Sequence, residues 1–148
     1  MAASAWAVLN RAKPKLLTGG LDLDSGTWKM ALCTSAQSIT ADFAGTSTDA
    51  RYSDLTGQVA NGNGYTTGGQ TITLTVTRST GTVTVDTSDV SFTSSTFDAK
   101  YAVIYCDSAT NKDILCFCDL ETGDADGLSP NNGTLSVTIH ASGLFTLA

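Results

Sequence analysis

Apolar residues recur at every second position in a series of short runs along this chain, which is the pattern of half-buried β-strands. The clearest runs are Trp28 to Cys33, Ile72 to Val76, Val83 to Val85, Val90 to Phe92 and Leu135 to Ile139, with a last short run in Gly143 to Leu147. Ser79-Thr80-Gly81 separates the second run from the third. Turn residues between two alternating runs predict a β-hairpin.

Two further runs are apolar at nearly every position rather than at alternate ones. They cover residues 100–106, with Ala-Val-Ile-Tyr at the centre, and residues 114–120. Strands of this kind are typical of the middle of a sheet that is covered on both faces. The turn-forming segment 107–111 joins them, so we expect an antiparallel central pair.

The N-terminal segment follows a different pattern. Between Ala3 and Leu17, Trp6, Leu9 and Leu16 recur at helical spacing. This periodicity predicts a short amphipathic helix. Pro14 lacks a backbone donor and disfavours helical geometry at the residue before it, so we expect the helix to kink or end there.

These elements predict a mainly β fold: an antiparallel β-sandwich or barrel of about eight strands with a short N-terminal helix. At 148 residues the chain fits a single domain, with residues 1–20 as a helical segment or arm and residues 21–148 as the β domain. Two long irregular stretches, Ser35 to Asn61 and Glu121 to Gly133, interrupt the pattern. Loops of this length usually carry a function or a contact.

Composition supports the strand prediction and excludes some classes of function. Thr and Ser occupy 39 positions, 24 of them Thr. Threonine, a β-branched residue with a hydroxyl group, fits a pleated strand that has one face in solvent and the other packed. A net charge of −6 and a pI near 4.4 argue against nucleic-acid binding and against an anionic membrane surface. The first residues lack the uninterrupted apolar stretch of a secretory signal, so we expect folding in a cytoplasm.

The glycine-rich stretch Ala60 to Ile72 contains four glycines and resembles a phosphate-binding loop at first sight. A Walker loop requires Lys where Gln70 stands, and a dinucleotide fingerprint requires a helix where residues 71–77 predict a strand. We therefore interpret the glycines as a backbone device that permits positive φ angles and close backbone approach at a sharp entry into the strand.

The four cysteines are Cys33, Cys106, Cys116 and Cys118. Three of them lie in predicted strands, and the last two point to the same side of one strand, so we expect buried reduced thiols. Two disulfides remain an alternative, and the scattered spacing does not match the paired knuckles of a zinc site.

The acidic segment 119–128 resembles part of a calcium loop. When Gly127 is aligned with the invariant glycine of that loop, Thr122 occupies the first ligand position and Gly133 the place of the bidentate Glu. We therefore expect a solvated acidic loop, and no metal or cofactor is predicted for the chain.

Candidate catalytic residues are few. His140 is the only imidazole, at the end of an apolar strand, where a local hydrogen bond is the commoner role. Glu121 is the only glutamate, and no serine lies in a nucleophile elbow. We do not expect an enzyme.

The order of several short segments resembles a family of small virion structural proteins of tailed bacteriophages. The segments are Trp6; Lys15-Leu16-Leu17-Thr18-Gly19; Asp22-Leu23; Thr27 to Ser35; Leu55 to Ala60; Gly64-Tyr65; Gly68-Gly69-Gln70-Thr71; Val90-Ser91-Phe92-Thr93; Ala99 to Tyr105; and Leu128 to Gly133. The resemblance covers most of the chain, although each segment is short. Cys116 and Cys118 are not part of the family pattern.

The resemblance implies a capsid decoration (cement) protein that binds and stabilises the major capsid protein lattice. Its partners would be the major capsid protein and neighbouring copies of itself, as a homo-oligomer such as a trimer, with no nucleic acid and no membrane. It would fold in the bacterial host cytoplasm and lie on the capsid surface of the virion. The family has no catalytic residues. A tail or tail-fibre component with a receptor- or glycan-binding module is the alternative, and a secreted enzyme or lectin-like domain comes third.

The predicted contact surface combines apolar residues of the N-terminal segment with those of the loop from Ile39 to Tyr52. Ordinary packing within the chain is the equal alternative for these residues. The candidate interface residues are Trp6, Leu9, Leu16, Ile39, Phe43 and Tyr52.

Overall fold

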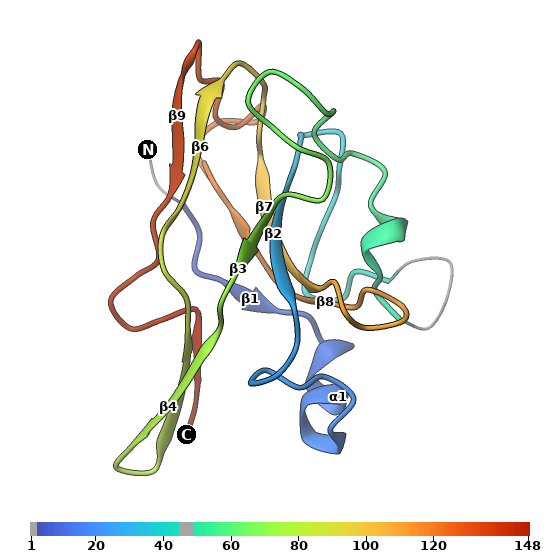
Figure 1. Cartoon of the computed structure of the whole chain (residues 1–148), viewed down its shortest axis with the longest axis vertical. Coiled ribbons are helices and arrows are strands. Elements are labelled where there is room, and N and C mark those ends of the chain that lie inside the picture. The colour runs from blue at the N-terminus through green and yellow to red at the C-terminus, as the bar shows by residue number, and fades with distance from the viewer. Residues whose placement is uncertain (1–2, 45–48) are drawn as a thin grey trace.

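The computed structural model describes residues 3–44 and 49–148 as a two-layered antiparallel β-structure with one short α-helix (Figure 1). The mainly β, sandwich-like fold predicted from the sequence is confirmed. Within those residues there are ten strands rather than about eight, and they do not close into a barrel. The elements are β1 (Ala7–Val8), α1 (Ala12–Thr18), β2 (Trp28–Cys33), the 3₁₀-helix η1 (Tyr52–Asp54), β3 (Gln70–Ile72), β4 (Thr75–Ser79), β5 (Thr82–Asp86), β6 (Val90–Ser95), β7 (Tyr101–Cys106), β8 (Ile114–Asp119), β9 (Gly133–Val137) and β10 (Phe145–Leu147).

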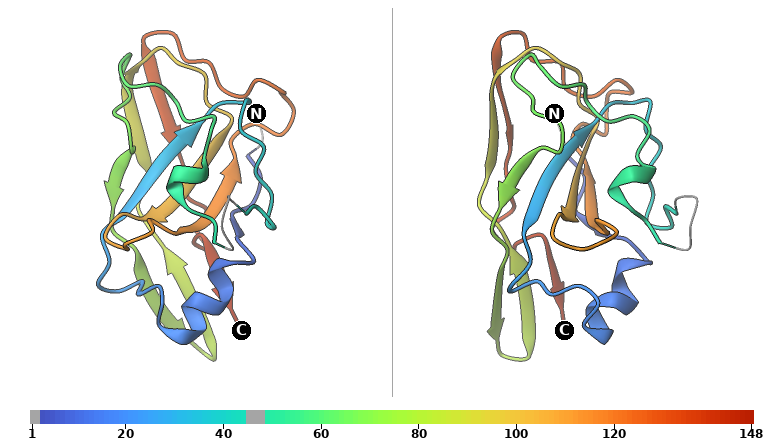
Figure 2. Two further views of the ribbon diagram at one scale, coloured as in Figure 1. Left: turned by 90° about the vertical axis from the view of Figure 1, so that its right-hand side faces the viewer. Right: turned by 45° about the vertical axis from the view of Figure 1, so that its right-hand side comes forward.

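The larger sheet has the strand order β1-β8-β7-β2-β3, and its neighbouring strands are antiparallel. The second layer consists of two smaller sheets, β10-β5-β4 and β6-β9 (Figure 2). In three places the chain leaves one sheet and enters another: β3 leads into β4, β5 into β6, and β9 into β10. The chain therefore turns from the first layer into the second along β3 and β4.

The central strands of the larger sheet are buried on both faces, as their continuous apolar runs predicted. Five of the six residues of β7 are buried, and β7 lies between β2 and β8. The register pairs Met30 with Ile104 and Ala31 with Val103, so successive pairs point to opposite faces. All four of these residues are fully buried. One face packs against the second layer, and the other is covered by the long loop that follows β2 (Figure 2).

The N-terminal segment differs from the helix predicted over residues 3–17. Residues 4–9 are extended along β8, because the N–H of Ser4 donates to the Asp119 carbonyl at 2.8 Å and that of Leu9 to the Leu115 carbonyl at 3.0 Å. The helix begins at Ala12, near the place where it was expected to end. Pro14 lies in its first turn, where the backbone N–H groups have no intrahelical acceptor, so proline costs little there.

The glycine-rich stretch acts as the backbone device predicted from the sequence. Gly64 and Gly69 have φ angles of 88° and 77°. A Cβ atom at Gly69 would lie 1.9 Å from the carbonyl oxygen of Met30, and one at Gly64 would lie 2.5 Å from that of Ser94. Only glycine permits both the positive φ and the close approach. The stretch thus joins β3 to the edge of β2.

The hairpin predicted around Ser79 to Gly81 is also present. β4 and β5 pair from Thr75–Asp86 to Ser79–Thr82. Thr80 and Gly81 both have positive φ angles, 45° and 89°, as a two-residue type I′ turn requires.

The four cysteines are free thiols and are buried. Burial raises the pKa of Cys33 to about 12, and burial together with nearby Cys118 raises the pKa of Cys116. At neutral pH these groups hold far less thiolate than an exposed cysteine, and the thiolate is the reactive form. They behave as small apolar side chains of the core.

This arrangement predicts that a thiol reagent reacts slowly with the native chain and with four equivalents after denaturation, without prior reduction. The measurement is absorbance titration with a disulfide reagent in buffer and in guanidinium chloride. Fewer than four equivalents in denaturant would reveal a disulfide and contradict the structure.

Candidate binding surfaces

The long loop after β2 covers the larger sheet and is fastened to it by hydrogen bonds. Gln37 is 4% exposed, and its side-chain carbonyl accepts the N–H groups of Thr56 at 2.8 Å and Gly57 at 3.2 Å. This amide ties the two ends of the loop together. Further backbone bonds fasten the loop to the body, including one from the N–H of Ile114 to the Ala50 carbonyl at 2.9 Å. Residues 45–48 of the predicted contact loop lie outside the described residues.

An aromatic stack holds the middle of the loop on the outer face of the larger sheet. The rings of Tyr52 and Tyr105 lie 4.3 Å apart and nearly parallel. The Tyr105 hydroxyl donates to the Gly68 carbonyl at 3.0 Å, and the Tyr52 hydroxyl is 2.5 Å from the side-chain oxygen of Gln58. Burial raises the pKa of Tyr105, so its hydroxyl remains a donor. The stack explains why Tyr52 is only partly accessible.

The six residues predicted as an interface therefore separate into two groups. Leu9 is fully buried and Ile39 is 5% exposed, so both belong to the core and offer no surface to a partner. For these two residues the alternative of packing within the chain is correct. These two residues are apolar because they are part of the hydrophobic core. The other four, Trp6, Leu16, Phe43 and Tyr52, are partly buried and pack against the core. The structure does not gather the six residues into one patch.

The acidic loop after β8 is organised around an internal cation that the sequence analysis missed. The Lys100 ammonium lies 2.5 Å from the Glu121 carbonyl, 2.6 Å from the Asp124 carbonyl and 3.0 Å from the Asp119 carboxylate. Its side chain is only 9% exposed. An ammonium group has three donors, and these three acceptors match them. The loop is therefore ordered by Lys100, and the only sequence signal was a single lysine at the start of an apolar strand.

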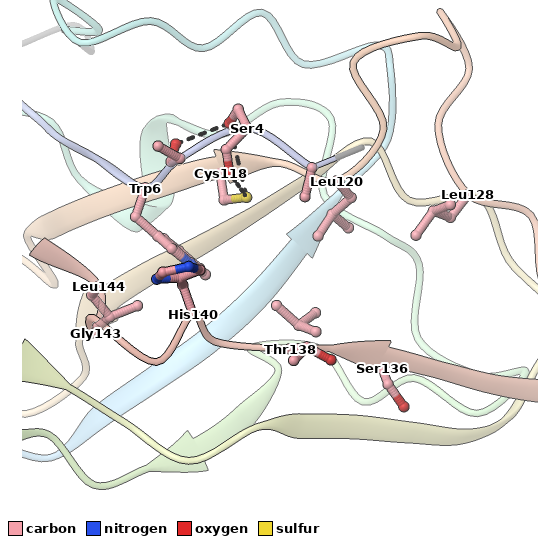
Figure 3. Close-up of a pocket in the computed structure, with 13 residues that line it drawn as sticks. Ser4, Trp6, Cys118, Leu120, Leu128, Ser136, Thr138, His140, Gly143 and Leu144 are labelled. Carbon is pink, nitrogen blue, oxygen red and sulfur yellow. Dashed lines mark hydrogen bonds between the residues drawn. The ribbon is translucent and has the colours of Figure 1, made fainter. Parts of the chain in front are cut away.

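An open groove, here called the seam, separates the edges of the two layers on one side of the molecule (Figure 3). Its volume is about 810 Å³. Residues 3–6, Cys118 and Leu120 line it from the larger sheet, and residues 136–138, His140, Gly143 and Leu144 line it from the second layer, with Leu128 from the connecting loop. The seam lies where the strands of the two layers do not pair to close a barrel. Sequence reasoning placed Trp6 on a surface but had no signal for the groove beside it.

His140 has the local role expected from the sequence. Its Nδ1 atom accepts a hydrogen bond from the N–H of Ser142 at 3.1 Å. In the part of the chain that the structure describes, no group of three or more His, Cys, Asp or Glu residues is arranged to hold a metal ion. The same residues contain no helix of the length and apolarity needed to cross a bilayer.

The sheet β10-β5-β4, here called the projecting sheet, extends beyond the rest of the molecule at the end where α1 lies (Figure 1). All five residues of β4 are exposed. The register puts Val76, Val85 and Phe145 in one row and Arg78, Val83 and Leu147 in the next row of the same face. This face is apolar except for Arg78 on its outer strand, whereas the opposite face carries Thr77, Thr84 and Thr146.

Among the described residues, the exposed large apolar side chains all lie at the end of the molecule formed by the projecting sheet and α1. They are Leu17 on α1 at 84% exposure, Leu147 at 51% and Val76 at 43%. Val85, in the same row as Val76, is 1% exposed. The apolar face of the projecting sheet thus begins in the core and continues uncovered to the end of the hairpin.

Comparison with protein-family models, with curated protein sequences and with solved structures found no match to this chain.

The Lys100 contacts predict a measurable difference between a buried and a surface ion pair. Replacing Lys100 with Met leaves a carboxylate and two carbonyls without their donor, and we expect a loss of about 3 kcal/mol in the free energy of unfolding. Lys29 pairs with Asp107 at 3.1 Å but is 28% exposed, so Lys29→Met is the matched control and should cost under about 1 kcal/mol. Urea unfolding measures both. Equal losses would contradict the internal role of Lys100.

Proposed function

We propose that this chain is a structural component of a bacteriophage virion, a capsid decoration protein that binds and stabilises the lattice of the major capsid protein. Two lines of argument support the proposal. The first is the resemblance of an ordered set of short segments to small virion structural proteins. The second is the distribution of exposed apolar groups on a fold whose long loop is already committed to its own sheet.

The observation that carries the proposal is the apolar face of the projecting sheet. Val76 and Leu147 lie on this face, and the sheet has only Arg78 and Asp86 as charged residues. Burial of apolar area stabilises a contact by about 25 cal/mol per Å². A surface with few ions loses little to desolvation when it is covered by a partner. Such a face suits a permanent contact better than a transient one.

Repetition on a capsid strengthens a contact of this kind. A protein that binds a lattice at many equivalent positions stabilises the shell even when each contact is small, because neighbouring contacts act together. The net charge of −6 opposes non-specific association of the free protein before assembly. A compact body with one apolar end is therefore consistent with decoration of a shell.

The first test is the location and copy number of the protein in purified particles. We expect it on heads, in a number proportional to the capsid subunits, as measured by quantitative gel analysis and cryo-electron microscopy. A low copy number confined to tails would contradict the capsid role and favour the tail alternative. Absence from particles would contradict both.

The second test is a pair of variants on neighbouring residues of β10. Leu147→Asp puts a charge on the apolar face, and Thr146→Asp puts the same charge on the opposite face of the same strand. Both positions are exposed, so both variants should fold. Burying the carboxylate at position 147 should weaken binding to heads that lack the protein by at least about tenfold. Co-sedimentation measures the binding. Equal weakening by both variants would contradict the proposed contact face.

A further inference from the structure

The two rims of the seam are both free sheet edges. Among the described residues, β1 pairs only with β8, β9 only with β6, and β10 only with β5. Residues 3–6 form the rim of the larger sheet, and residues 136–138 form the rim of the second layer. A free edge presents backbone N–H and C=O groups that can pair with another chain.

Neither rim carries the charges that usually protect an edge strand. Natural sheets block unwanted pairing with lysines, inward charges or prolines on the edge. Here residues 3–9 contain no Asp, Glu, Lys or Arg, and neither do residues 127–148, although 15% of the whole chain is charged. Pro130 precedes β9 and does not interrupt it. The chain is thus uncharged along the two segments that face each other across the groove.

The charge distribution and the openness of the seam together select the side on which two copies can meet. Two chains of net charge −6 repel one another at most approaches. The opposite side, where β3 and β6 are the outer strands, is also uncharged, but there the Gln70 side chain donates to the Ser91 carbonyl at 2.7 Å and links the two strands. The seam is an open groove, and both of its rims are uncharged. Its lining combines apolar groups such as Trp6 and Leu144 with hydroxyl groups such as Ser136. Backbone pairing and apolar burial can therefore develop there without placing like charges in contact.

We propose that the seam is a dimer interface at which a second copy of this chain docks edge to edge. The two rims of the seam are a fixed distance apart, so a partner that pairs with both needs two strand edges at that same distance. A second copy of the chain meets this requirement, because it has the same two rims. A two-fold axis then brings both rims of one copy against both rims of the other, and the interface closes without further growth. The sheets of one copy continue into those of its partner, in the manner of strand addition.

This inference deepens the proposed function by naming one partner of the structural protein, and it rests on that function only for its role in a particle. The dimer itself is a property of the isolated chain. A monomeric chain would overturn the seam inference and would leave binding to heads untouched. Loss of head binding would have no effect on a dimer measured in solution.

The test uses the full chain and two lysine variants of matched residues. Ser136 and Ser91 are paired in register on β9 and β6, both are exposed, and their hydroxyls are 3.1 Å apart. Ser136 lines the seam, whereas Ser91 lies one strand away from it. Ser136→Lys and Ser91→Lys remove the same hydroxyl contact and add the same charge. They differ in whether the lysine stands on the strand that lines the seam.

Sedimentation equilibrium over a wide range of protein concentration gives the oligomeric state. We expect a dimer for the unaltered chain and for Ser91→Lys, and at least a tenfold larger dissociation constant for Ser136→Lys. If the unaltered chain is monomeric at every concentration, the proposal is overturned. A trimer, a Ser136→Lys dimer of unchanged affinity, or equal weakening by both variants overturns it as well. If Ser136→Lys fails to fold, Thr138→Lys on the same rim takes its place, with the same expected loss.

Discussion

Coverage of the larger sheet on both faces is the constraint on which the rest of this structure depends. β2, β7 and β8 are apolar on each side, and exposing either side to water would forfeit the burial that stabilises the fold. The second layer covers one face. The loop between β2 and β3 covers the other, held there by the buried amide of Gln37 and the stack of Tyr52 on Tyr105. The buried residues of this loop, such as Gln37 and Ile39, are therefore not available to a partner.

The same constraint decides which surfaces remain for function. Once both faces of the larger sheet are covered, the uncovered features are an end and a side of the molecule. The end is the apolar face of the projecting sheet, which lies at the same end of the molecule as α1 (Figure 1). The side is the seam between two uncharged free edges. Under the two proposals above, the end would contact a lattice and the side would contact a second copy of the chain.

Much of the fold follows from local patterns in the sequence. Alternation located most strands, the continuous apolar runs identified the central pair β7 and β8, and the glycines at 64 and 69 indicated close backbone approach. The short N-terminal helix is present, but it covers only Ala12–Thr18. Its predicted first part, residues 3–9, is extended, because Trp6 and Val8 fit a strand as well as a helix. Hydrogen bonding to β8 makes this segment a strand rather than a helix, and the spacing of apolar residues does not reveal that pairing.

The surfaces were harder to predict than the strands. Leu9 and Ile39 are apolar because they are buried, and a sequence does not distinguish a buried apolar residue in a loop from an exposed one. The Lys100 ammonium inside the acidic loop depends on a contact between residues more than twenty positions apart. The seam depends on strands that fail to close a barrel. Only the missing charges of residues 3–9 and 127–148 were visible beforehand, and their meaning required the knowledge that both segments are edges.

The long loop covers the chain's own sheet, and we propose that the projecting sheet and the seam bind partners. Hydrogen exchange, compared between the free chain and the chain bound to heads, tests this claim most directly. The account predicts that amides of the long loop, such as those of Thr56 and Gly57, are already protected in the free chain and change little. New protection should appear in β4, β9 and β10. New protection confined to the long loop, with β4, β9 and β10 unchanged, would contradict the account.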